Sequence, residues 1–300
     1  MTGTRMRMIA LLCAAALALL GACSNDSGDT SDPAPEAEPT ETETPSEEPS
    51  DVSSPGEEEE GVDETNTVSF QVWFANGKRL APAVATVDRT PRVGAAALEA
   101  LFVGPAGAGN LTSAVPADTA LNGLEIEDGT ATVDLSSEFA SGNGIPSMGM
   151  RLGQLTFTLT QFPTVKRVVL ELDGERVERF SQEGLVIEKP LTRADFEDIS
   201  PAIIVNRPLG GSEVSGSVRV SGTANVFEAN VSIRILTSDG DAVARTFTTA
   251  TCGSGCRGTF SKKVRFDVDE PTEATLQVYE ESAETGKPTN MIEVPLMLLP

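Results

Sequence analysis

Residues 24–64 cannot contribute to a hydrophobic core, and this confines any globular fold to the chain that follows. The segment carries 16 Asp and Glu residues, no Lys or Arg, and only Val52 and Val62 as branched aliphatic residues. So little apolar surface cannot offset the entropy lost on ordering. We therefore predict an extended, acidic, Pro-rich tether over residues 23–64, reaching beyond the flexible-coil estimate of ~35 Å. The alternative for Glu57–Glu60 is binding of divalent cations or a basic partner, although such charge runs usually only solvate a chain.

The N-terminus has the form of a bacterial lipoprotein signal. Arg5 and Arg7 precede the apolar stretch Met8–Leu20, and Leu20-Gly21-Ala22-Cys23 resembles a lipobox, in which the cysteine is acylated and becomes the new N-terminus. An uncleaved membrane helix is the alternative, but the 13 residues of that stretch extend only ~20 Å against a hydrocarbon core of ~30 Å. We predict a signal peptide over residues 1–22 and a lipid anchor on Cys23 (palmitate in the acyl group), which holds the protein on the extracytoplasmic face of the cell membrane.

The charge balance and the missing histidine exclude several function classes. Of the net charge of −23, most lies in the tether, because residues 65–300 contain 29 acidic and 20 basic residues. An exported, mildly acidic fold is unsuited to nucleic acid, which requires a basic face. The chain contains no histidine, which excludes Ser-His-Asp and Cys-His catalysis and histidine-based zinc hydrolases. We predict that the protein is not an enzyme and binds no cofactor and no metal.

Two cysteines remain for the folded part of the chain. Cys252 and Cys256 are separated by Gly253-Ser254-Gly255, small residues that let the chain reverse within a tight disulfide. An exported location permits the bond. Zinc binding would need further thiolate or imidazole ligands, and a free thiol pair is the other alternative. We predict a Cys252–Cys256 disulfide.

Residues 65–180 show the pattern of an α+β domain. Alternating apolar and polar residues predict strands, and Asn76-Gly77, Asp128-Gly129 and Asp173-Gly174 predict hairpin turns between them. A first helix is expected from Thr90-Pro91, with Thr90 as its cap, to Gly104-Pro105. A second helix is predicted by the apolar stripe Met148, Leu152, Leu155, Leu159 and Phe162. The resulting order is ββαββαββ, an α+β sandwich.

Three strings in this region resemble the GerMN domain. They are Leu101-Phe102-Val103-Gly104-Pro105, the run from Thr130 to Phe139, and Thr158-Leu159-Thr160-Gln161-Phe162-Pro163 ahead of Val168–Gly174. The GerMN domain is named from spore-germination and sporulation proteins, recurs in actinobacterial envelope lipoproteins, and is similar in fold to ring-building modules of sporulation assemblies. The resemblance supplies no catalytic residues. Asp134 and Ser136 are expected to cap the following turn.

Residues 202–300 predict a second domain, after a linker over residues 181–201. Seven short strands with Gly, Pro and Asp-Gly turns are typical of a β-sandwich; they are expected at 203–206, 213–224, 229–237, 242–251, 258–268, 273–280 and 291–298. The strings Val220–Ala224, Val226–Val231, Cys256–Phe260 and Tyr279-Glu280 resemble the Gmad2 family, an immunoglobulin-like domain associated with spore germination and often found after GerMN. Phe227-Glu228 is a candidate recognition feature, but a core aromatic beside a solvated carboxylate is the favoured interpretation.

Two functions follow from these patterns. The first is a non-catalytic protein-interaction or scaffolding lipoprotein that docks an envelope partner or associates with itself. The second is a module binding peptidoglycan or another surface polymer, which requires Trp73 or Tyr279 to be exposed because sugar binding uses aromatic faces. Glycan cleavage by a carboxylate pair ~5–10 Å apart is the remaining enzymatic alternative, and Asp134, Glu138 and Glu228 are its candidates. We favour the first function.

Overall fold

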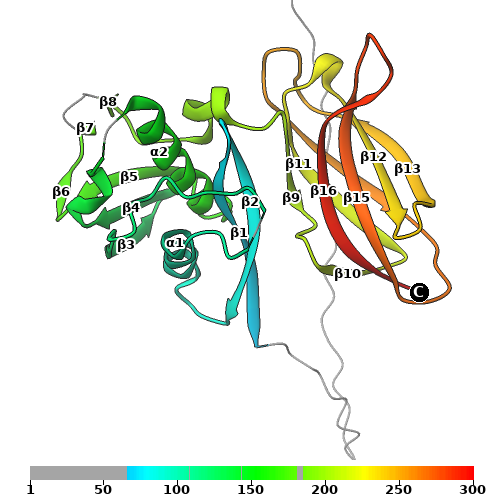
Figure 1. Ribbon diagram of the computed structural model, residues 1–300, viewed down its shortest axis with the longest axis horizontal. Coiled ribbons are helices and arrows are strands. Elements are labelled where there is room, and N and C mark those ends of the chain that lie inside the picture. Colours follow the sequence, from blue (N-terminus) through cyan, green and yellow to red (C-terminus); the bar gives the residue numbers. More distant parts are fainter. Residues whose placement is uncertain (1–65, 108, 143, 181–184) are drawn as a thin grey trace, which may run out of the picture. The chain divides into compact units, whose positions relative to one another are not determined.

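The computed structural model describes residues 66–107, 109–142, 144–180 and 185–300 (Figure 1). These residues belong to a single compact unit. An α+β region comes first in the chain and an all-β sandwich follows it, so the predicted fold class is confirmed.

The α+β region has the predicted ββαββαββ order. Its elements are β1 (Thr67–Asn76), β2 (Arg79–Asp88), α1 (Val93–Val103), β3 (Leu121–Glu127), β4 (Thr130–Leu135), α2 (Ile145–Leu159), β5 (Arg167–Leu172) and β6 (Glu175–Arg176), with a 3-10 turn η1 (Ser137–Ala140) before α2 and the short strands β7 (Arg179–Phe180) and β8 (Leu185–Val186) after β6. Strands β1 and β2 form a two-stranded antiparallel ribbon. The other sheet has the order β3-β4-β5-β6, in which β4 and β5 run parallel.

Helix α2 joins the ribbon to the rest of the core. Met148, Leu152, Leu155 and Leu159 are fully buried, as the apolar stripe predicts. Phe162, the last predicted member of the stripe, lies beyond the end of α2 and is only partly buried. Side chains from α2 and the turn after it also satisfy the backbone of β1: Trp73 N donates to Thr158 Oγ1 at 3.0 Å, and Gln71 N donates to Gln161 Oε1 at 2.7 Å. The acceptors for these β1 amides are side chains instead of the carbonyl groups of a neighbouring strand. A ribbon of only two strands can therefore pack against α2 without leaving these backbone N–H groups unpaired.

Turn residues set the ends of most strands and helices where the sequence predicts them, with two exceptions. Asp128-Gly129 and Asp173-Gly174 both have positive φ at each position, as two-residue hairpin loops of this type require. In the first hairpin the pairing of Asn76 with Arg79 makes Gly77-Lys78 the loop, one residue later than predicted. Helix α1 begins at Val93, and its N-cap is Arg92 without a side-chain cap; the Thr90 hydroxyl instead accepts from Arg92 N at 3.1 Å.

Part of the predicted linker packs against the α+β core. Leu191 pairs with Val168 in an isolated bridge, and Leu191 and Phe196 are both buried in the first hydrophobic cluster. Phe196 lies in the 3-10 segment η2 (Arg193–Ile199), which begins with a capping box between Thr192 and Asp195. The sequence predicted a linker here because of Pro190 and the acidic residues around Phe196. Two apolar side chains of the segment, Leu191 and Phe196, nevertheless pack into the core.

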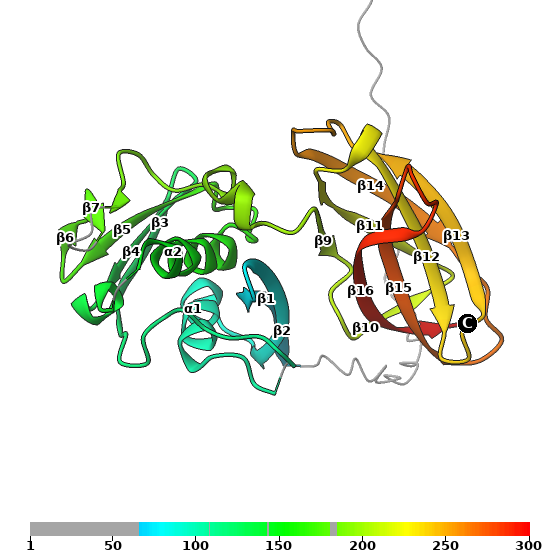
Figure 2. The same ribbon diagram turned by 45° about the horizontal axis from the view of Figure 1, so that its top comes forward.

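The sandwich consists of two facing sheets (Figure 2). Sheet β14-β11-β9 faces sheet β10-β16-β15-β12-β13; the strands are β9 (Ile203–Arg207), β10 (Ser212–Ser215), β11 (Ser217–Ala224), β12 (Asn230–Thr237), β13 (Ala242–Thr249), β14 (Gly258–Arg265), β15 (Thr272–Glu281) and β16 (Pro288–Leu299). The single strand predicted over 213–224 is interrupted at Gly216, where φ is +59°. This break lets β10 pair with β16 in one sheet and β11 pair with β9 in the other.

Candidate interaction site

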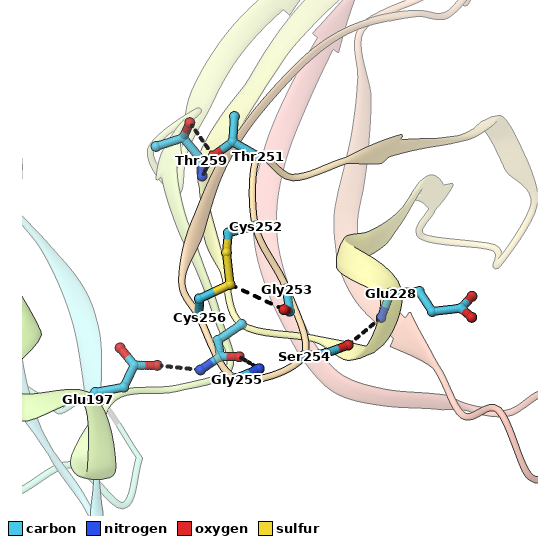
Figure 3. Close-up of a disulfide and its surroundings, with 10 residues drawn as sticks. Glu197, Glu228, Thr251, Cys252, Gly253, Ser254, Gly255, Cys256 and Thr259 are labelled. Carbon is cyan, nitrogen blue, oxygen red and sulfur yellow. Dashed lines mark hydrogen bonds between the residues drawn. A yellow bond between two sulfur atoms is a disulfide. The ribbon is translucent and has the colours of Figure 1, made fainter. Parts of the chain in front are cut away.

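A disulfide closes the loop between β13 and β14 at one end of the sandwich. Cys252 and Cys256 are joined, with their Cα atoms 5.7 Å apart (Figure 3). Ser254 and Gly255 adopt positive φ, at +55° and +110°. The reversal expected from the small spacer is therefore present, and the pair has the predicted partners.

The disulfide loop packs directly on the loop between β11 and β12. Ser254 Oγ accepts from Glu228 N at 2.9 Å, and Ser254 N donates to Val226 O at 2.9 Å. Gly253 lies so close to the neighbouring loop that a Cβ atom would be 2.4 Å from Ala229 N. Only glycine permits this approach, so the two loops are in direct backbone contact.

The loop between β11 and β12 exposes Phe227 to solvent. The Phe227 side chain is 54% exposed, while Val226 and Ala229 beside it are buried. The favoured interpretation of Phe227 as a core aromatic is therefore wrong. Glu228 and Ala229 have φ of +53° and +56°, and these consecutive left-handed residues turn the chain so that Phe227 points outward.

The backbone of this tip is strained and held in place. Non-glycine residues in the left-handed region cost about 1–3 kcal/mol each and persist only where their surroundings determine them. Here Phe227 N donates to Glu280 Oε1 at 2.7 Å, and Glu228 N donates to the Ser254 hydroxyl. We call Phe227–Ala229, together with the disulfide loop 252–256, the aromatic tip. Backbone strain that is held by surrounding contacts is common in loops that bind ligands or partners, and the aromatic tip has both features.

A polar cluster fixes the disulfide loop from the other side. Arg257 donates twice to Glu197, from Nε to Oε2 at 2.8 Å and from Nη2 to Oε1 at 3.0 Å. Asn225 Nδ2 donates to Glu197 Oε1 at 2.9 Å, and Asn225 Oδ1 accepts from Gly255 N at 3.1 Å. Figure 3 shows Glu197 on this side of the loop, with the Glu228 carboxylate pointing away from the disulfide. The cluster of Glu197, Asn225 and Arg257 thus connects η2, the end of β11 and the aromatic tip.

The cluster changes the titration of its carboxylate. Burial by itself would raise the pKa of Glu197, but the hydrogen bonds from Arg257 and Asn225 and the charge of Arg257 outweigh burial. The pKa of Glu197 is consequently lower than its ordinary value of 4.5. The carboxylate is ionised and paired at neutral pH.

The candidate catalytic acids are not assembled into a site. Asp134 Oδ1 accepts from Gly174 N at 2.9 Å, so this carboxylate caps a distant turn instead of the next one. Glu138 is exposed in η1 and Glu228 is exposed on the aromatic tip. Within the described ranges, no hydrogen bond or ion pair links any two of the three, and no group of three metal-ligating side chains is present.

The two aromatic residues required by the polymer-binding alternative are buried. Trp73 is 0% exposed and stacks edge-on against Phe157 at 4.8 Å between ring centroids. Tyr279 is 9% exposed and is covered by the Arg234 guanidinium at 5.0 Å. Neither ring offers a free face to a sugar.

The predicted anchor Cys23, the signal peptide and the tether with Glu57–Glu60 lie outside the described residues. In the part of the chain that the structure describes, no helix has the length and apolar character needed to span a membrane.

Sequence reasoning missed the outward position of Phe227 and the Glu197–Arg257 pair. The pair joins residues 60 positions apart, and no local pattern connects them. The one available signal was Arg257 itself, a charged residue placed directly after Cys256 and before the strand β14.

Both folded regions match models of known protein families. Residues 58–178 match the Germane family model, described as sporulation and spore germination. Residues 202–287 match the Gmad2 model, described as the immunoglobulin-like domain of bacterial spore germination.

Similar individual proteins come from Bacillus subtilis. The spore germination protein GerM (strain 168) is 32% identical over 88 residues, which is 29% of this chain and 24% of GerM, so the chain matches about a quarter of that relative. The solved first GerMN domain of GerM has 24% identity and a TM-score of 0.37, covering 42% of this chain and 98% of that one. The tandem GerMN domains have 17% identity and a TM-score of 0.40, with coverages of 77% and 60%.

The pKa of Glu197 predicts a pH-dependent contribution to stability. Because the folded-state pKa is depressed, the contribution is fully present above the ordinary value of 4.5 and is lost as pH falls through the lower folded-state value. Glu197→Gln should therefore lower the free energy of unfolding at neutral pH, by about 1 kcal/mol or less since the pair is partly exposed. Chemical denaturation across this pH range should show the difference from wild type shrinking towards acid.

Glu284→Gln, which removes an exposed glutamate outside the cluster, is the matched control. A Glu197→Gln difference that stays constant or widens on acidification would contradict the assignment.

Proposed function

Since the chain carries a Germane domain followed by a Gmad2 domain of the spore-germination type, we propose that it is a non-catalytic envelope protein that works by binding a protein partner. The observation that carries this proposal is the aromatic tip. An exposed phenylalanine is held there on a strained backbone by a disulfide-closed loop.

The geometry of the tip favours protein recognition. Interface hot spots are commonly aromatic side chains that fill a pocket on the partner. A side chain on a preorganised loop loses less conformational entropy on binding than one on a mobile loop. The carboxylate of Glu228 is exposed beside Phe227, so the complementary partner surface is an apolar pocket with a basic rim.

The same proposal places the protein on the outer face of the cell membrane, anchored through Cys23. The lipobox-like string and the acidic tether support this placement. A tether of this composition would let the folded region reach partners at a distance from the bilayer. Peptidoglycan binding is not favoured, because Trp73 and Tyr279 are buried.

Replacing the exposed aromatic tests the proposed binding surface. Phe227→Ala should reduce the amount of partner crosslinked in intact membranes by about tenfold, the effect of losing one moderate hot spot. Its melting temperature should stay close to wild type, since the ring is largely solvent-exposed. Pull-down after crosslinking, with quantitative mass spectrometry, measures the recovery.

Phe247→Ala is the matched control, because Phe247 is 62% exposed on β13 of the same sandwich. Equal recovery of the partner with Phe227→Ala and wild type would disprove the role of the tip. If the crosslinked product is a second copy of this chain, the partner is the protein itself.

Removing the proposed lipid attachment point tests the location. Cys23→Ser should shift the protein from the membrane fraction to the soluble exported fraction, because no other residue is proposed to be acylated. Cys13→Ser, which changes the other cysteine of the signal segment, should leave the protein in the membrane. Retention of Cys23→Ser in the membrane at the wild-type level and apparent mass would contradict the anchor.

A further inference from the structure

A cavity of about 430 Å³ lies away from the aromatic tip. It is lined by β1, the start of α1, the turn after α2, η2, and the end of β9 with the residues that follow it, all within the same compact unit. Its size falls within the range of small-molecule sites. Nothing in the proposed function uses it.

Arg193 lines this cavity from η2. Its guanidinium stacks over Phe157 at 4.7 Å and over Trp73 at 5.6 Å from the ring centroids. Nε donates to Thr160 Oγ1 at 2.9 Å and Nη2 donates to Phe157 O at 3.2 Å. These contacts fix the orientation of the guanidinium group and leave Nη1 without a protein acceptor among the described residues.

The charge of Arg193 is not neutralised by a neighbouring acid. Over the residues that the structure describes, no carboxylate lies within 4.0 Å of the guanidinium. Burial, and secondarily the charge of Arg257, lower the pKa of Arg193 to about 10, so the group is still cationic at neutral pH. Arg193 is partly buried. Removing a cation from water without a paired anion is costly, and a bound anion would relieve that cost.

The rest of the lining adds a second cation and no acid. Arg207 and Asn206 line the cavity from the end of β9, while no Asp or Glu of the described chain contributes to its wall. This is unusual in a folded region with more acidic than basic residues. A cavity lined by one sign of charge concentrates ligands of the opposite sign.

The remaining walls combine apolar side chains with the uncharged polar residues Ser69, Gln71, Thr160 and Gln161. Val68, Phe70, Phe162 and Leu209 line the cavity beside the two arginines. An inorganic ion would leave these surfaces wet, whereas an organic ligand can cover them. The ligand that fits is an anion with an apolar body.

We propose that this cavity binds a small organic carboxylate. Its carboxylate lies between Arg193 and Arg207, and its apolar part packs against Phe70 and Leu209. A carboxylate matches the site because its two coplanar oxygens fit the edge of a guanidinium group whose plane is already fixed. This binding site is independent of the aromatic tip.

Titration of the full chain tests the site with three probes: N-acetyl-leucine, its neutral amide N-acetyl-leucinamide, and inorganic phosphate. Calorimetry should show saturable binding of the acid and at least about tenfold weaker binding of the amide and of phosphate, the effect of losing the charged contact or the apolar contact. The NMR signal of Arg193 Nε should shift with the acid and stay in place with the amide.

Two charge reversals locate the binding. Arg207→Glu should weaken binding of N-acetyl-leucine by about tenfold or more, since it removes a cation and introduces repulsion. Arg265→Glu, which reverses an exposed arginine on β14 outside the cavity, should leave the affinity unchanged. Both residues are exposed, so neither variant should disturb folding.

Four results would each overturn the proposal: no saturable binding of N-acetyl-leucine, equal binding of the acid and its amide, binding of phosphate without binding of the acid, or equal weakening by both charge reversals.

Discussion

The bidentate pairing of Glu197 with Arg257 is the interaction on which the position of the aromatic tip depends. Glu197 belongs to η2, whose Phe196 is buried in the α+β core, and Arg257 directly follows the disulfide. Arg257 also donates to Pro201 O at 2.8 Å, just before the sandwich begins. Asn225 extends the network to Gly255. One polar cluster therefore couples the segment after the first domain to the loop that supports Phe227.

This arrangement explains why a loop with two left-handed non-glycine residues can exist. The disulfide limits the freedom of residues 252–256, and the polar cluster fixes where that loop lies. The loop then supplies the Ser254 hydroxyl to Glu228 N and the close approach of Gly253 to Ala229. Strain at Glu228 and Ala229 is tolerated because several independent contacts determine the same conformation. The result is an exposed aromatic side chain whose position is fixed by contacts within the protein itself.

The sequence predicted those features that short patterns control. Aspartate-glycine turns tolerate positive φ, so two hairpins could be located to the residue, and the buried stripe of α2 followed from its spacing. The prediction was wrong where contacts between residues far apart in the sequence determine the position of a side chain. Phe227 was expected in the core because an aromatic residue beside a solvated carboxylate usually buries its ring, whereas its outward position depends on contacts with the disulfide loop. The cavity around Arg193 was missed for the same reason, since Arg193 and Arg207 are brought together only by tertiary packing.

Amide hydrogen exchange tests most directly whether the aromatic tip is preorganised. In the oxidised chain, Phe227 N and Glu228 N donate to Glu280 and Ser254, so both amides should exchange at least about tenfold more slowly than after selective reduction of Cys252–Cys256. The amide of Ile233, within β12, should be unaffected by reduction. Exchange of Phe227 and Glu228 in the oxidised chain at the rate of unprotected amides would show that the tip is mobile and would contradict the account.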